Sequence, residues 1–130
     1  MAKFKGNRKL AMLFILLSIG WIGILFAESS QPPAKIMGEV SGLDKLAHFV
    51  AFGVLAFFLC AVAFCVNDKP AVPLFSMPLL VSALSGILEE GYQMTVPGRA
   101  GSLLDLTADL SGAAFVILLV NRYCIKRSCH

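Results

Sequence analysis

Apolar residues are gathered into four long stretches, separated by three short polar connectors. The stretches cover residues 10–27, 49–66, 71–88 and 102–120. Only the last contains charges, at Asp105 and Asp109. A helix of 18 residues, the length of each of the first three stretches, is about 27 Å long and matches the hydrocarbon thickness of a bilayer. The pattern therefore predicts four membrane-spanning helices.

Capping residues and prolines indicate where these helices begin and end. Either Ser41 or Asp44 is a suitable N-cap for the second helix, and Ser102 is one for the fourth. Pro73 suits the start of the third helix, and we expect Pro78 to kink it. The predicted spans are residues 10–27, 44–66, 73–91 and 102–120.

The basic residues before the first stretch leave open a secretory signal peptide. However, the apolar run is longer than the about 7–15 residues of a signal peptide's apolar region. Leu25 also stands where cleavage after Ala27 would need a small residue. We therefore expect an uncleaved span.

Backbone groups in lipid must form hydrogen bonds within their own segment, so each span is expected to be helical. The predicted fold class is all-α: an integral membrane four-helix bundle, with residues 1–130 forming a single domain. The composition agrees, because 58% of residues are hydrophobic, only 15% are charged and the mean hydropathy is +0.80. These values exclude an ordinary soluble domain and a disordered chain.

Lysine and arginine are distributed unequally between the two sides of such a bundle. Eight fall on the side of the termini and three on the other: the eight are Lys3, Lys5, Arg8, Lys9, Lys69, Arg122, Lys126 and Arg127. Because basic residues in short loops prefer the cytoplasm, both termini are predicted to be cytoplasmic. Charges dispersed over two tails and one loop do not form a nucleic-acid-binding surface, so we expect membrane lipids, not nucleic acid, as partners.

Polar residues gather at the outer ends of the second, third and fourth helices. Asp44 and His48 are four residues apart, and Glu90 and Gln93 are three apart, so each pair shares a helix face. Asp109 lies one turn deeper than Asp105. Charged groups in a membrane segment normally face the interior of the bundle. We expect one outward-facing polar pocket, with the first helix acting only as a scaffold.

Three functions fit this pocket, and the sequence does not decide between them. In the first, it binds an anionic envelope lipid or glycan precursor. The ligand-binding residues are then Lys45, Gln93, Arg99, Asp105 and Asp109. In the second it is an enzyme, with His48 and Glu90 as acid and base and Asp44 orienting His48. In the third, the protein is a structural or accessory subunit of an envelope membrane complex. Neither a metal nor another cofactor is expected, because the sequence has no spacing such as HExxH.

Four short motifs occur in order: Asp44-Lys45-x-x-His48-Phe49, Glu90-x-x-Gln93, Pro97-Gly98-Arg99 and Ser102-x-x-Asp105. Together they resemble the signature of the VanZ-like family over residues 43–120. One position departs from it. Relatives often have Asn four residues after the aspartate that matches Asp105, where this chain has Asp109.

The resemblance implies a small multi-pass protein of the bacterial cell inner membrane that works in the cell envelope. The family is named for an accessory protein associated with resistance to the glycopeptide antibiotic teicoplanin. The resemblance thus raises a link to antibiotic resistance as a hypothesis, and it specifies neither a reaction nor an oligomeric state.

Overall fold

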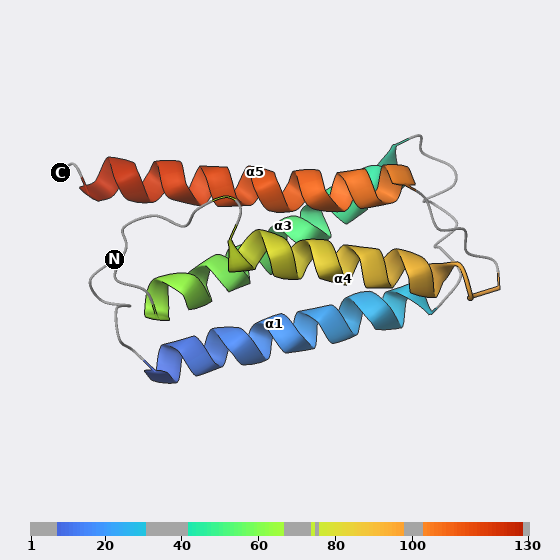
Figure 1. Ribbon diagram of the computed structural model, residues 1–130, viewed down its shortest axis with the longest axis horizontal. Coiled ribbons are helices and arrows are strands. Elements are labelled where there is room, and N and C mark those ends of the chain that lie inside the picture. Colours follow the sequence, from blue (N-terminus) through green and yellow to red (C-terminus); the bar gives the residue numbers. More distant parts are fainter. Residues whose placement is uncertain (1–7, 31–41, 67–73, 75, 98–102, 129–130) are drawn as a thin grey trace.

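The computed structural model describes residues 8–30, 42–66, 74, 76–97 and 103–128, without the side chains of Asp44 and residues 124–128. Its helices are α1 (Arg8–Ser29), α3 (Leu43–Val66), α4 (Met77–Gln93) and α5 (Leu103–Ser128). They run alternately up and down, so that the start of α1 and the end of α5 lie at the same end of the bundle (Figure 1). The described residues contain no strand, which confirms the all-α fold.

The third helix starts later than expected. Residue 73 was predicted to begin it, but α4 begins at Met77, after Ser76 as an N-cap with extended backbone. Pro78 lies in the first turn, where its missing N–H has no helical acceptor to lose and its fixed φ suits the helix. The predicted kink at Pro78 is therefore wrong. The fourth helix is also longer than predicted, because it continues past residue 120 to Ser128.

Three of the described helices, α1, α3 and α5, are long and apolar enough to cross a membrane. The remaining helix, α4, has 17 residues and is about 25 Å long at the usual helical rise. Its C-terminal part also contains the acidic pair Glu89-Glu90. Four equivalent membrane-spanning helices were predicted, and α4 differs from the other three in being shorter.

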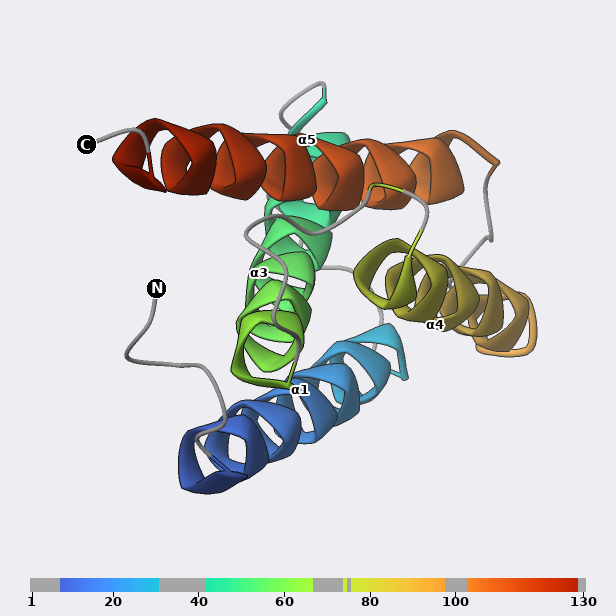
Figure 2. The ribbon, with the colours of Figure 1, turned by 60° about the vertical axis from the view of Figure 1, so that its left-hand side comes forward.

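The central helix of the bundle is α3. It packs most extensively on α5 and also contacts α1 and α4, and Figure 2 shows it crossing α5 and reaching α1. One buried cluster joins α3 to α5 through Ala56, Cys60, Ala113 and Ile117. A second, around Phe52 and Leu55, joins α3 to α1. By contrast, most of the apolar surface of α1 is exposed, as expected for a helix that faces lipid.

Small residues bring α3 and α5 unusually close together. A Cβ on Gly112 would overlap the backbone carbonyl of Phe49, and a Cβ on Gly53 would lie 3.0 Å from Val116. Close backbone approach at small residues is typical of helix contacts in membranes. Because Phe49 follows His48 and Gly112 lies one turn after Asp109, this contact sets the distance between two candidate site residues.

Candidate functional site

His48 of α3 and Asp109 of α5 form the centre of a buried polar cluster. His48 Nδ1 lies 2.8 Å from Asp109 Oδ1, within hydrogen-bond distance. The exposed fraction is 9% for His48 and 0% for Asp109. Burial of both groups makes their interaction strong, because little water screens it. From the sequence, Asp44 was predicted to orient His48, but the side chain of Asp44 lies outside the described residues. In the structure Asp109 holds the ring.

Lys45 and Asp105 form the outer layer of the same cluster, one helical turn toward the end of the bundle. Lys45 Nζ donates to Asp105 Oδ1. The other oxygen of Asp105 lies 3.9 Å from His48 Nε2. Asp105 is buried, whereas the Lys45 side chain is 41% exposed. Lys45 therefore stands at the boundary between the buried cluster and its surroundings.

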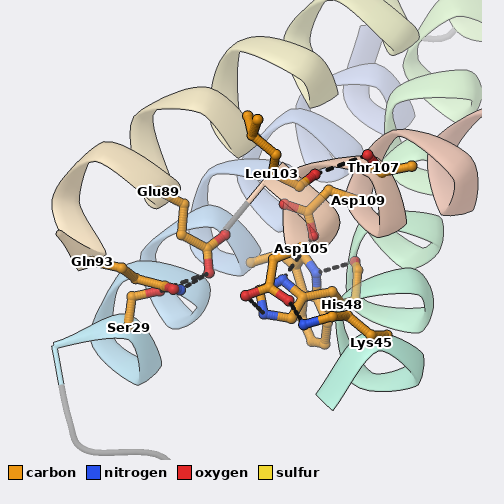
Figure 3. Close-up of polar contacts among 11 residues, drawn as sticks. Ser29, Lys45, His48, Glu89, Gln93, Leu103, Asp105, Thr107 and Asp109 are labelled. Atoms are coloured by element: carbon orange, nitrogen blue, oxygen red, sulfur yellow. Dashed lines mark hydrogen bonds and ion pairs between the residues drawn. The ribbon is translucent and has the colours of Figure 1, made fainter. Parts of the chain in front are cut away.

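A second network links α4 to the end of α1. The Ser29 hydroxyl donates to Glu89 Oε1 at 2.6 Å. Gln93 Nε2 donates to Ser29 Oγ at 3.0 Å and to Glu89 Oε1 at 3.3 Å. All three residues are at least 96% buried. Figure 3 shows them beside the side chains from α3 and α5. The first helix is thus more than a scaffold, because it contributes Ser29 to the cluster.

Glu90 connects α4 to the central pair. It is 6% exposed, and one of its oxygens lies within 4.8 Å of donor atoms from His48 and Asp109. Gly86, one turn earlier, permits this approach: a Cβ there would lie 3.2 Å from Asp109 Oδ2. Three helices therefore bring titratable groups to one point, as the sequence predicted from their common depth.

The cluster contains more acid than base. Among the described residues it holds four carboxyl groups that are at most 6% exposed: Glu89, Glu90, Asp105 and Asp109. The basic groups beside them are His48 and the part-exposed Lys45. An uncompensated buried carboxylate is costly in a low-dielectric setting. The cluster therefore favours the binding of positive charge, either protons or a cation, at its centre.

The structure brings most of the predicted site residues together. His48, Glu90, Gln93, Lys45, Asp105 and Asp109 all lie in this cluster. Arg99 and the Asp44 side chain lie outside the described residues. Ser29 and Glu89 were missed as members. Glu89 received no predicted role, and no pattern around Ser29 indicates that a lone serine after an apolar run meets α4.

Two grooves adjoin the cluster along α3 and α5. The smaller has a volume of about 520 Å³, and its lining includes Lys45, Phe49, Thr107 and Ser111. The larger, of about 800 Å³, is lined by apolar residues that include Phe49, Phe57 and Phe115. Because Phe49 lines both, the grooves are neighbours. Lys45 lines only the smaller of the two.

The chain matches the sequence model of the VanZ/LLP1 family over residues 12–125. No curated protein and no solved structure matches it. The matched region contains every described residue of the cluster.

Proposed function

Because the chain belongs to the VanZ/LLP1 family, we propose that this membrane protein binds an anionic envelope lipid or lipid-linked glycan precursor. We place it in the bacterial cell inner membrane as a multi-pass protein. Its termini are cytoplasmic, and the polar cluster faces the outer side. The distribution of eight basic residues against three supports this orientation.

The position of Lys45 carries the proposal. Lys45 is one of the residues that line the smaller groove, together with Thr107 and Ser111, and its side chain is 41% exposed. An ammonium has three N–H donors, so Lys45 can hold Asp105 and face a phosphate together. The larger apolar groove beyond Phe49 suits an acyl or prenyl chain. A single amphiphilic lipid can therefore place its headgroup at Lys45 and its apolar chain along α3 and α5. The ligand roles of Arg99, Gln93, Asp105 and Asp109 are part of this proposal.

The test is native mass spectrometry of the full-length protein released from mild detergent, titrated with phosphatidylglycerol and with phosphatidylcholine. The wild type is expected to retain phosphatidylglycerol preferentially, and Lys45→Gln to lose that preference by at least fivefold. Lys9→Gln is the matched control, because Lys9 is an exposed basic residue at the opposite end of the bundle. Arg99→Gln tests the ligand-binding role of Arg99, which is predicted from the sequence alone.

A second variant tests the groove without changing charge. Ala108 lines the smaller groove, and Ala108→Phe fills that space. It should weaken lipid retention while Lys45 stays intact. If Lys45→Gln and Ala108→Phe both retain phosphatidylglycerol as the wild type does, the binding proposal is wrong. Copurification of an envelope protein in fixed ratio would then favour the accessory-subunit alternative.

Catalysis by His48 and Glu90 is a separate hypothesis that claims more than binding does. His48 is held by Asp109 at 2.8 Å, an arrangement in which a carboxylate fixes the tautomer of an imidazole. Conversion of the retained lipid, measured as a mass change over time and abolished in His48→Gln, would establish an enzyme. A link to teicoplanin resistance is tested by the susceptibility of a strain that expresses the protein.

A further inference from the structure

Potential metal ligands from three helices converge inside the bundle. His48 of α3, Glu90 of α4 and Asp109 of α5 each offer one donor atom, and these atoms lie within 4.8 Å of one another. An ion with ligands at about 2.0–2.2 Å holds them roughly 3–4 Å apart. A shift of about an ångström would therefore bring all three donors to a common ion.

The charge balance of the cluster favours such an ion. Four carboxyl groups are buried here, and His48 and Lys45 are the basic groups beside them. His48 also interacts electrostatically with Asp105, Asp109 and Glu89. With His48 neutral as a ligand and Lys45 positively charged, a divalent cation at the centre would reduce the excess of negative charge from three to one.

Glu89 supplies an independent indication. It is 4% exposed, and its Oε1 accepts from Ser29 and Gln93. Its Oε2 is buried and has no hydrogen-bond partner among the described residues. The carboxylate interacts electrostatically with Asp109, His48 and Glu90. In Figure 3 it points from α4 toward the side chains of α3 and α5. A buried oxygen without a hydrogen bond is costly, and a cation beside it would reduce that cost electrostatically.

We propose that His48, Glu90 and Asp109 bind one divalent first-row transition metal ion, with Glu89 as a fourth, outer group. One imidazole with carboxylates suits Zn²⁺ or Mn²⁺, whereas Mg²⁺ and Ca²⁺ prefer oxygen ligands alone. The hydrogen bond between His48 and Asp109 already brings two ligands together. The ion replaces the proton that they share. Asp109 is common to this site and to the lipid proposal, but metal binding requires neither Lys45 nor a lipid, so either proposal can fail alone.

The experiment must separate this site from the C-terminal tail, which carries Cys124, Cys129 and His130. The full chain is therefore studied with Cys124→Ser and Cys129→Ser, purified in detergent and stripped with chelator. Titration calorimetry with Zn²⁺ or Mn²⁺ should show one equivalent per chain. The double variant Glu90→Gln/Asp109→Asn should bind at least tenfold more weakly. Glu28→Gln, at an exposed acid of α1, should bind like the background protein.

Two further readouts keep the test decisive if the double variant folds poorly. X-ray absorption of the Zn²⁺-loaded protein should show nitrogen and oxygen ligands, including one imidazole and no sulfur. Saturating Zn²⁺ should raise the thermal midpoint of the background protein, because a ligand that binds only the folded state stabilises it. Absence of stoichiometric metal, retention of wild-type affinity in the double variant, or a spectrum without imidazole would overturn the proposal.

Discussion

Gly112 of α5 lies directly against the backbone carbonyl of Phe49 in α3, and a Cβ at Gly112 would overlap it. Because this carbonyl belongs to the backbone, it cannot move away by a change of side-chain rotamer. His48 precedes Phe49, and Asp109 lies one turn before Gly112. The separation of the two helices at this point therefore sets the geometry of the polar cluster.

Gly112→Ala should destabilise the bundle. Overpacking costs about 1–3 kcal/mol, and a backbone obstacle places this variant in the upper part of that range. The free energy of unfolding in mixed detergent micelles, followed by circular dichroism, measures the effect. Gly20→Ala is the control, because nothing lies within 4 Å of a Cβ there and alanine is the better helix former by about 1 kcal/mol. Equal stability of the two variants would refute the close contact.

Asp109→Ala should cost about 3–5 kcal/mol, since it removes one partner of a buried pair and leaves His48 without its carboxylate. Asp109→Asn should cost clearly less, because an amide oxygen still accepts from the His48 ring. The same unfolding measurement compares the two. If asparagine is as disruptive as alanine, the charge of Asp109 matters to folding more than its hydrogen bond does.

Ser29→Ala should lower the free energy of unfolding by about 1–3 kcal/mol, because Glu89 and Gln93 lose a buried partner. The neighbouring hydroxyl gives a matched control. The Ser30 hydroxyl donates to the backbone oxygen of Ala27, and this bond is exposed. Ser30→Ala should change stability by less than about 0.5 kcal/mol. A similar, small loss in both variants would show that α1 is only a scaffold after all.

Lys45 and Asp105 should be energetically coupled. A double-mutant cycle with Lys45→Ala and Asp105→Ala is expected to give a coupling energy of about 1 kcal/mol, because one partner is buried and the other is 41% exposed. The cycle separates this pair from the other contacts that each residue makes. Additive effects of the two single changes would exclude a stabilising role for the ion pair.

The number and type of helices follow from the sequence alone. Uncharged runs such as residues 49–66 can be stable in lipid only as helices, because no other regular segment satisfies its own backbone groups. The depth of His48, Glu90 and Asp109 along their helices also follows from simple counting, and this predicted their convergence. The start of α4 did not follow from the sequence alone, because two prolines, Pro73 and Pro78, both suit a first helical turn, and the structure places Pro78 there.

Which side chains touch was decided only by the tertiary structure. The close contact of α3 and α5 at Gly112 paired His48 with Asp109. The packing of α1 on α4 placed Ser29 beside Glu89. A spacing within one helix, such as that from Asp44 to His48, cannot predict hydrogen-bond partners about 60 residues away in the chain. For the same reason no metal motif is visible in the sequence: the three candidate ligands come from three different helices, and packing alone brings them together.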